Sequence, residues 1–394
     1  MLNDPIVITG LARTPMGAFQ GELSSLTGPQ LGAVAIREAV TRSGVAPADV
    51  EEVIMGCVLP AGQGQAPARQ ASLGAGLPLA AGCTTINKMC GSGMKAAMLA
   101  HDVLLGEQGY IMVAGGMESM SNAPYLLPKA RTGLRMGHGQ VLDHMIYDGL
   151  EDAYDKGRLM GTFAEDCAGK YAFTRESQDQ FAVTSLQRAQ KANTEGWFAW
   201  ETTPIAIKAG KEQKFVETDE QPFKANLEKI PTLKPAFRKD GTVTAANSSS
   251  ISDGAAALVM MRRSVAEQRG LRPLAVVMGH ATHAQEPGLF TTAPVGAIAK
   301  LFERTGWNAK NVDLFEINEA FAVVTMAAMR EHGLPHEKVN VHGGACALGH
   351  PIGASGARIM VTLIGALRKY GLKRGVASLC IGGGEATAMA LEMI

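Results

Sequence analysis

Apolar residues along the chain fall into short blocks that predict alternating helices and strands. Residues 31–56, LGAVAIREAVTRSGVAPADVEEVIMG, show helical apolar periodicity, then a turn, and then a strand. Residues 84–105, TTINKMCGSGMKAAMLAHDVLL, predict a short strand and a helix, separated by Cys90 and a Gly-Ser-Gly sequence. Residues 6–10, IVITG, predict another strand. Because strands alternate with helices, we expect an α/β fold in which a mainly parallel sheet is covered by helices.

Three segments of the first part of the chain recur in the same order later in the chain. The pairs are 31–56 with 295–318, 91–100 with 353–367, and 110–118 with 377–385. In the second pair, Ser92-Gly93 aligns with Ser355-Gly356, and both open an apolar helix. Three ordered matches predict two related α/β halves.

Residues 121–245 have no counterpart in this duplication and are richer in charged residues, aromatic residues and proline. Residues 250–261, SISDGAAALVMM, return to the pattern of a buried strand and complete the first half. The predicted domains are an N-terminal half of residues 1–120 plus 246–270, an inserted region of residues 121–245 that lies over the site, and a C-terminal half of residues 271–394.

The composition excludes several kinds of partner. The 394 residues are 46% hydrophobic, and Lys+Arg and Asp+Glu both number 37, so nothing favours a nucleic acid or an anionic membrane. No apolar run approaches the roughly 18 residues that span a bilayer. The N-terminal sequence MLNDPIVITG lacks the basic residues of a secretory signal. Six cysteines without a Cys-x-x-Cys pair suit reduced thiols, so we expect a cytoplasmic protein.

Cys90 is a candidate nucleophile. Gly91 and Gly93 allow close approach to the backbone, and the helix that follows directs N–H groups and a positive dipole end toward the sulfur. Such a position is expected to lower the pKa of the thiol toward neutrality. A buried structural cysteine is the plainer alternative. The sequence GSGMKA also fits a loose dinucleotide fingerprint, but no acidic residue follows where that fingerprint requires one.

His350 is the candidate base for this thiol. It lies in residues 343–358, GGACALGHPIGASGAR, just ahead of a Gly-Ala-Ser-Gly sequence that opens the duplicate of the Cys90 helix. If the two halves are related by symmetry, the two helix openings face a common centre. His342, Cys346 and His350 also have helical spacing, as metal ligands would, but the intervening glycines and proline interrupt a helix. We therefore expect no metal site there.

Two predicted strand ends carry further candidates. Cys380 ends the strand VASLC just before three glycines, a position where α/β folds place chemistry, although a buried structural cysteine would look the same. Asn318 and Glu319 follow a strand in EINEAFA, where a solvated helix cap with Asn318 as N-cap is the alternative.

Five blocks together resemble the thiolases, closest to their acetyl-CoA acetyltransferase branch: NKMCGSGMKA, GGMESMS, NEAFA, NVHGGACALGHPIGASGAR and CIGGGEA. The resemblance implies a thiolase-like α/β fold of two pseudo-symmetric αβαβα halves with an inserted loop domain that binds coenzyme A. It also implies a homotetramer, built as a dimer of dimers, that acts on acyl-CoA thioesters without a metal or redox cofactor.

The same resemblance implies roles for the candidates. Cys90 would accept the acyl group, and His350 would activate its thiol. Cys380 would move a proton at the α carbon. Asn318 would help hold the water that, with His350, stabilises the enolate oxygen, and the N–H groups of Cys90 and Gly382 would form a second oxyanion hole. The implied reaction is the reversible condensation of two acetyl-CoA molecules through an acetyl-cysteine.

Residues of the acyl and pantetheine sites follow from the resemblance too. They are Ser249 near the pantetheine, and Phe237, Met160 and Ala320 in the pocket. Leu159 and Phe290 depart from the histidine and methionine that many acetoacetyl-specific thiolases carry. A broader-range 3-ketoacyl-CoA thiolase is therefore an alternative. A decarboxylating condensing enzyme would lack a cysteine like Cys380, and a non-catalytic acyl-CoA or lipid carrier would be expected to lose Cys90 or His350.

Overall fold

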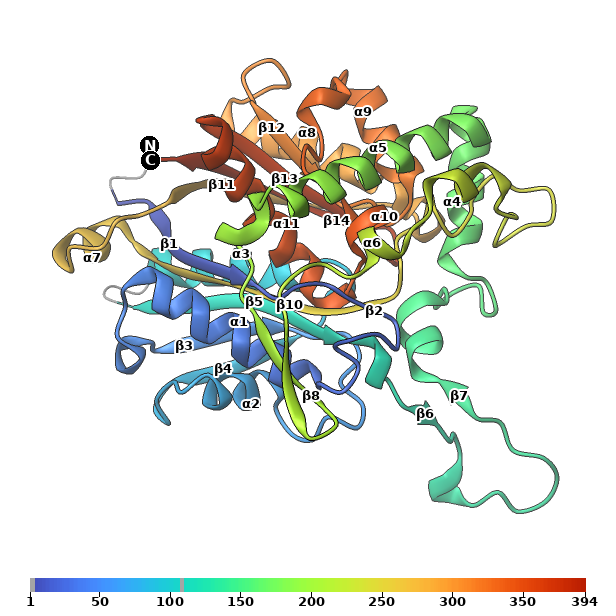
Figure 1. Cartoon of the computed structure of the whole chain (residues 1–394), viewed down its shortest axis with the longest axis horizontal. Coiled ribbons are helices and arrows are strands. Elements are labelled where there is room, and N and C mark those ends of the chain that lie inside the picture. Colours follow the sequence, from blue (N-terminus) through green and yellow to red (C-terminus); the bar gives the residue numbers. More distant parts are fainter. Residues whose placement is uncertain (1–3, 107–109) are drawn as a thin grey trace.

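A ten-stranded sheet runs through the computed structural model, which describes residues 4–106 and 110–394 (Figure 1). Residues 1–3 of the N-terminal segment MLNDPIVITG lie outside the described residues. The strands follow the order β12-β13-β14-β11-β1-β10-β5-β3-β4, and the short β2 (Gly17–Ala18) pairs with β10. Their bounds are β1 Ile6–Arg13, β3 Glu52–Gly56, β4 Gly82–Ile86, β5 Ile111–Ser119, β10 Ser252–Arg262, β11 Ala275–Ala284, β12 Leu314–Ile317, β13 Arg374–Ile381 and β14 Glu385–Met393.

The two halves of the sheet repeat one arrangement. The order β3-β5-β10-β1 in the first half matches β12-β13-β14-β11 in the second. Helices α1 (Gly28–Ser43) and α8 (Ala293–Thr305) precede β3 and β12, and helices α3 (Ser92–Gly106) and α11 (Ile352–Tyr370) precede β5 and β13. The predicted duplication is confirmed, with each sequence match falling on equivalent elements.

The expectation of a mainly parallel sheet is wrong. Only three described strand pairs of this sheet are parallel, β3–β4, β3–β5 and β12–β13, and the other pairs are antiparallel. β10 returns beside β5 after the inserted region, and β14 returns beside β13 after a tight turn in which Gly383 and Gly384 have φ near 90°. These strands are buried on both faces, and a continuous apolar run carries no information on strand direction.

Helices lie in three layers, one between the two halves of the sheet and one on the outer face of each half. α3 and α11 pack against each other between the two halves of the sheet, and their apolar residues share one core cluster with strands of both halves. α1 and α2 (Pro67–Gly74) cover the outer face of the first half. α8 and α9 (Ala322–His332) cover that of the second, and the short α7 (Arg263–Gln268) follows β10. The result is the five-layered αβαβα order that the resemblance to the thiolases implies.

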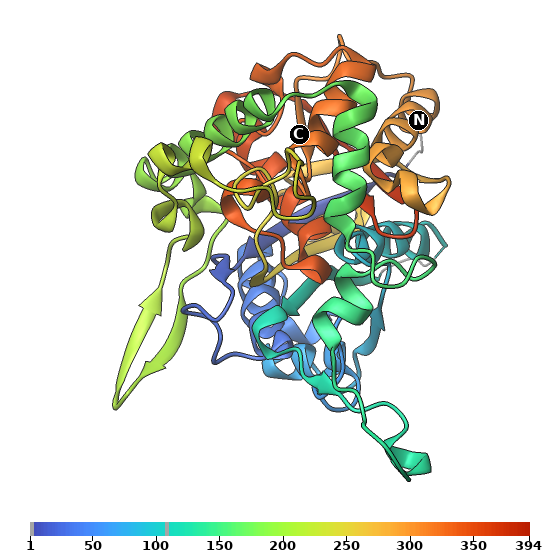
Figure 2. The same ribbon diagram turned by 90° about the vertical axis from the view of Figure 1, so that its right-hand side faces the viewer.

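The chain between β5 and β10 forms the inserted region. It contains the β6–β7 pair (Tyr125–Leu126, Leu142–Asp143), helices α4 (Met160–Tyr171), α5 (Arg175–Thr194) and α6 (Gln221–Lys224), and the β8–β9 ribbon (Ile205–Ala209, Glu212–Val216). Figure 2 shows that the segment around β6–β7 and the β8–β9 ribbon both project from the body of the molecule. No helix among the described residues has the length and apolar character needed to cross a bilayer.

A buried ion cluster fastens the inserted region to the sheet. The guanidinium of Arg13 on β1 donates to Glu201 at 2.6 Å and to Asp219 at 2.7 Å, and all three side chains are excluded from solvent. Glu201 also accepts from Thr362 on α11 at 2.9 Å. Because breaking a buried ion pair leaves an unpaired charge, this cluster holds the inserted region firmly over the two halves.

Candidate active site

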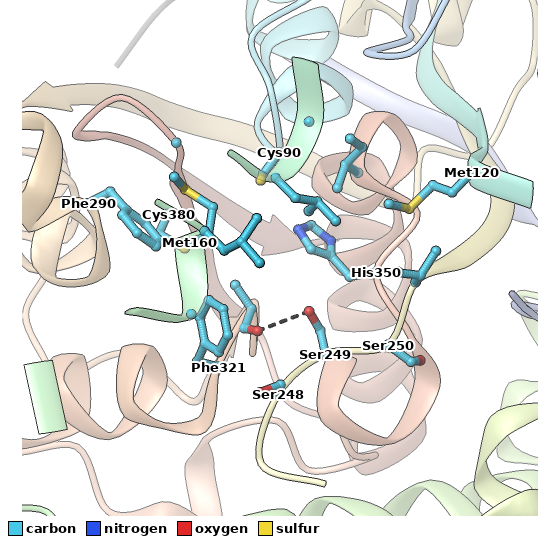
Figure 3. Close-up of a pocket in the computed structure, with 18 of the residues that line it drawn as sticks. Cys90, Met120, Met160, Ser248, Ser249, Ser250, Phe290, Phe321, His350 and Cys380 are labelled. Carbon is cyan, nitrogen blue, oxygen red and sulfur yellow. Dashed lines mark hydrogen bonds between the residues drawn. The ribbon is translucent and has the colours of Figure 1, made fainter. Parts of the chain in front are cut away.

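A pocket of about 270 Å³ brings together side chains from both halves and from the inserted region. Figure 3 shows Cys90, His350 and Cys380 around one cavity, with Met160 of the inserted region beside them. Asn318 does not line this cavity. The predicted site residues that do line it are Cys90, His350, Cys380, Gly382, Ser249, Phe237, Met160, Ala320, Leu159 and Phe290.

Cys90 lies in a tight turn between β4 and α3. Met89 has a φ of 45°, a left-handed conformation that few non-glycine residues adopt. The Ser92 hydroxyl holds the turn, since it donates to the Met89 carbonyl at 2.7 Å and accepts from the Lys88 N–H at 2.8 Å. The Lys88 ammonium forms an ion pair with Glu385 at the start of β14. The Cys90 turn is thereby tied to the second half of the sheet.

Glycines allow the two helix openings to meet. A Cβ atom on Gly93 would lie 2.7 Å from the backbone nitrogen of Ala357, so a larger residue would push α3 and α11 apart. A Cβ atom on Gly56 would lie 2.8 Å from the carbonyl oxygen of Gly353. These close approaches bring the N-terminal ends of α3 and α11 together, and His350 lies just before α11. The common centre that the duplication predicts is therefore present.

The expected lowering of the Cys90 pKa is wrong. Burial raises the pKa of Cys90 to about 11, although backbone N–H groups of Gly382 and of Cys90 itself act in the opposite direction. Desolvation disfavours the thiolate more than these dipoles favour it. At neutral pH the resting group is a thiol, so a nearby base has to take its proton before it can attack.

His350 has the tautomer that such a base needs. Its Nδ1 lies 2.5 Å from Ser355 Oγ, and that hydroxyl donates its own proton to the Pro351 carbonyl at 2.9 Å. Ser355 therefore accepts from Nδ1–H, and Nε2 keeps its lone pair. Nε2 is buried without a hydrogen-bond partner among the described residues. Burial and the charge of Arg358 lower the pKa of His350 to about 3, so the imidazole is neutral.

Cys380 is the second thiol of the pocket. It is almost fully buried near the end of β13, and Gly382 follows it in the turn to β14. Burial, then the proximity of Cys90, raise the pKa of Cys380 well above its usual range. Cys380 is therefore a protonated thiol at rest, and a strong base whenever it is ionised.

The solvated helix cap considered for Asn318 and Glu319 is wrong, because both side chains are buried and Phe321 is the N-cap of α9. Asn318 Nδ2 lies 3.5 Å from His350 Nδ1, and Asn318 Oδ1 accepts from Arg358 Nη2 at 3.5 Å. Asn318 therefore lies on the Nδ1 side of the His350 ring, and the buried guanidinium of Arg358 orients its amide.

Glu319 has a structural position. Its carboxylate accepts from Ser185 on α5 at 2.7 Å, from Asn340 at 2.8 Å and from the Cys346 N–H at 3.0 Å. Burial raises the pKa of Glu319 despite these bonds. The side chain ties α5 of the inserted region to the loop that leads to His350.

The pocket wall near the thiols is apolar. Phe290 is buried and packs edge-on against Phe163 on α4, with ring centroids 6.0 Å apart. Leu159 and Met160, at the start of α4, face the same space. On the opposite side the Ser249 hydroxyl donates to the Ala320 carbonyl at 2.9 Å (Figure 3).

Glu118 is a residue that sequence reasoning did not single out. Its buried carboxylate accepts from the N–H groups of Val58 at 2.9 Å, Leu59 at 3.1 Å and Gly353 at 2.8 Å. Burial raises the pKa of Glu118 to about 7, against the effect of these bonds. The signal available was its place in GGMES, a segment of the duplication. Pocket residues that were also missed are Met120, Ile146, Gly149, Leu150, Gly161, Ser248, Ser250, Ile251, Phe321 and Ile352.

His342, Cys346 and His350 do not converge on a metal position in the described part of the chain. The His342 ring packs against Trp197 and Phe198, and burial lowers its pKa to about 4. α10 (Ala345–Leu348) is a single turn, so the continuous helix that would align the three side chains does not form.

Comparison with known proteins agrees with this geometry. Residues 6–264 match the thiolase N-terminal domain, and residues 271–393 match the thiolase C-terminal domain. Acetyl-CoA acetyltransferase 1 of Arabidopsis thaliana is 51% identical over 393 residues, which span 99% of this chain and 94% of the relative. Acetyl-CoA acetyltransferase of Schizosaccharomyces pombe is 46% identical over 396 residues, which span 100% of both chains.

A solved structure shares the fold as well. The crystal structure of Acat5 thiolase from Ascaris suum in complex with coenzyme A has a TM-score of 0.92 and 42% sequence identity, and the match covers 99% of this chain and 100% of that one. The domain matches, the relatives and the structure agree over essentially the whole chain. This chain therefore belongs to the thiolase family.

Proposed function

We propose that the protein is an acetyl-CoA C-acetyltransferase, which reversibly condenses two acetyl-CoA molecules into acetoacetyl-CoA and free coenzyme A. The observation that carries the proposal is one apolar pocket in which two thiols accompany a neutral imidazole with a free Nε2. The names of the similar acetyl-CoA acetyltransferases and the coenzyme A complex of the Ascaris thiolase support the substrate class.

In the first half-reaction His350 Nε2 takes the proton of Cys90, and the sulfur attacks the thioester carbonyl of acetyl-CoA. The carbonyl oxygen becomes an oxyanion, which the N–H groups of Cys90 and Gly382 stabilise. When the tetrahedral intermediate collapses, coenzyme A leaves as a thiolate and receives the proton from His350. The products are acetyl-Cys90 and free coenzyme A, so atoms and charge balance.

In the second half-reaction Cys380 first gives its thiol proton to His350 Nε2, and the resulting thiolate removes an α proton from a second acetyl-CoA. His350 Nε2–H and a water held by Asn318 stabilise the enolate oxygen. The carbanion attacks the acetyl group, and Cys90 leaves as a thiolate that takes the proton from His350. In the reverse direction the Cys380 thiol protonates the departing carbanion, and its raised pKa suits that direction because the protonated form dominates at neutral pH.

The acyl pocket supports a short-chain preference. Phe290 is held against Phe163, so its ring occupies space that a longer acyl chain would need. The Leu159 side chain gives the acyl chain an apolar contact and has no polar group that would need a hydrogen-bond partner. The broader-range 3-ketoacyl-CoA thiolase remains the second candidate, because the same apolar wall accepts added methylene groups.

Assembly, location and cofactor use are also part of the proposal. The β6–β7 arm exposes apolar side chains, among them Met136 at 98% and Tyr125 at 69%, and such exposure marks a contact surface. β4 is an edge strand of the described sheet. Both features support a homotetramer. The six cysteines are free thiols, which supports a cytoplasmic location, and the proposed steps use coenzyme A only as substrate and product.

A steady-state comparison tests the proposal. Thiolysis of acetoacetyl-CoA should be fast, and acetyl-CoA alone should add one acetyl group to the peptide that contains Cys90. Binding of acyl-CoA without either reaction would favour a non-catalytic carrier, which the retained Cys90 and His350 argue against.

A further inference from the structure

Three potential metal ligands meet near the C-terminal end of α3, at the end of the helix opposite to Cys90. His101 Nδ1 lies 3.0 Å from Asp102 Oδ1, and His280 Nε2 on β11 lies 2.8 Å from the same oxygen. The three donor atoms all lie within 4.8 Å of one another. The ligands come from two elements of different halves, so the fold positions them independently of any ion.

The spacing fits a small divalent ion. Two donor atoms in adjacent positions of an octahedral site, each about 2.1 Å from the metal, are about 3.0 Å apart. The observed separations of Asp102 Oδ1 from the two imidazole nitrogens, 2.8 and 3.0 Å, are close to this value. The Asp102 side chain is 51% exposed, so an ion could enter from solvent and keep water in its remaining positions.

The donor set also fits a transition metal. Binding requires each imidazole to carry its proton on the other ring nitrogen, so that His101 Nδ1 and His280 Nε2 offer lone pairs to the ion. Two imidazoles and a carboxylate are donors that Zn²⁺, Co²⁺ and Ni²⁺ prefer over Mg²⁺ or Ca²⁺.

We propose that His101, Asp102 and His280 bind a divalent transition-metal ion and thereby clip the C-terminal end of α3 to β11. The ion would take no part in the acyl transfer, because Cys90 lies at the other end of α3. Lys95 places a positive charge near His280, so ionised Asp102 supplies the attraction for the cation. The expected consequence is a more stable attachment of the helix that carries the nucleophile.

Titration with Co²⁺ tests this site, with the visible absorption of the bound ion as readout. Cys90 is first blocked with iodoacetamide so that its thiol cannot bind metal. We expect one Co²⁺ per chain, and at least about tenfold weaker binding in His280→Gln and in Asp102→Asn. The exposed His138 provides the matched control, and His138→Gln should bind as the unchanged protein does.

A thermal measurement completes the test. Zn²⁺ should raise the melting temperature of the unchanged protein by a few degrees and leave that of His280→Gln unchanged. Equal Co²⁺ affinity in all variants, or no absorption at all, would show that the three side chains form a hydrogen-bonded group only and would overturn the proposal. Asp102 is half exposed and His280 is 14% exposed, and retained thiolysis activity would confirm that both variants fold.

Discussion

The imidazole of His350 is held by Ser355, whose Oγ lies 2.5 Å from Nδ1 while its own proton points to the Pro351 carbonyl. This contact leaves Nε2 as the free base in the pocket. Ser355 is the counterpart of Ser92 in the duplication, and Ser92 holds the Cys90 turn in the other half. Equivalent serines therefore support the nucleophile and its base.

The first prediction concerns this serine. Ser355→Ala should lower kcat by roughly 10- to 100-fold, because His350 loses the acceptor that sets its tautomer, while general-base catalysis as a whole is worth about 10² to 10⁴. Acetylation of Cys90 should slow by a similar factor in rapid-quench experiments. Thr362→Val, which removes another buried hydroxyl of α11, should alter stability more than the acetylation rate. Equal acetylation rates in Ser355→Ala and the unchanged protein would exclude this role.

The second prediction concerns Cys90 itself. Iodoacetamide should label Cys90 faster than Cys83 or Cys346, because His350 Nε2 can take the proton of Cys90 as the sulfur attacks, and acetyl-CoA should protect it. Since burial raises the pKa of Cys90 to about 11, the thiolate fraction and the labelling rate should keep rising between about pH 7 and 10. Peptide mass spectrometry at several pH values measures both. A rate that levels off below pH 8 would mean a stabilised thiolate and would contradict a neutral thiol–imidazole pair.

The third prediction separates the two thiols of the pocket. Cys380→Ser should still take an acetyl group from acetyl-CoA onto Cys90, because that step uses Cys90 and His350. Condensation should fall by about 10² to 10⁴, since the α proton then has no thiol to accept it. Intact mass measures the first step, and an assay of acetoacetyl-CoA formation measures the second. Near-normal condensation would remove Cys380 from the reaction.

The features that the sequence predicted well are local ones. The N-terminal ends of the helices at Cys90 and His350 could be predicted because Ser92 and Ser355 make contacts within a few residues, to the carbonyls of Met89 and Pro351. The duplication could be predicted from the sequence because the same local patterns occur in both halves. Strand direction was not, since β10 and β14 are buried on both faces and an apolar run is the same in either direction.

Properties that depend on burial could not be predicted from the sequence either. The helix dipole predicted a lowered pKa for Cys90, but the desolvation that raises it depends on which segments cover the thiol. Asn318 looked like a helix cap because the sequence does not show that Arg358 lies behind it. The sequence around Glu118 does not show that three backbone N–H groups from distant segments donate to its carboxylate.

The fourth prediction concerns Glu118. A glutamine amide cannot accept at both positions, so Glu118→Gln should reduce the free energy of unfolding by about 1–3 kcal/mol. The pKa of Glu118 is about 7 in the folded protein and about 4.5 when unfolded, so the unfolded chain loses its proton first as the pH rises. The stability contributed by the carboxyl group is therefore greatest below pH 4.5 and falls by about 3 kcal/mol up to pH 7.

Urea unfolding at pH 5 and pH 8 measures this difference. The advantage of the unchanged protein over Glu118→Gln should be smaller at pH 8 than at pH 5. Asp102→Asn provides a comparison with a carboxylate that is half exposed, and it should show a much weaker pH dependence. An advantage for Glu118 that grows with pH would contradict the raised pKa.

The fifth prediction concerns substrate range. Acetoacetyl-CoA should be the best substrate, with measurable thiolysis of 3-ketohexanoyl-CoA and little activity on long chains. Each added methylene gains roughly 0.8 kcal/mol from burial against Leu159, and about 1.4 kcal/mol corresponds to a tenfold change in kcat/KM. One or two methylenes could therefore raise kcat/KM several-fold, but Phe290, fixed against Phe163, limits the space that they can fill.

Two variants separate these opposing effects. Leu159→His should narrow the range toward acetoacetyl-CoA, because the longer acyl group would have to desolvate an imidazole. Phe290→Met should widen the range, since a flexible side chain replaces a ring that is held in place. Both are measured as the ratio of kcat/KM for 3-ketohexanoyl-CoA and acetoacetyl-CoA, in which any general loss of activity cancels. If thiolysis rates in the unchanged protein rose steadily from four-carbon to sixteen-carbon substrates, the short-chain proposal would fail, and the broader-range thiolase would take its place.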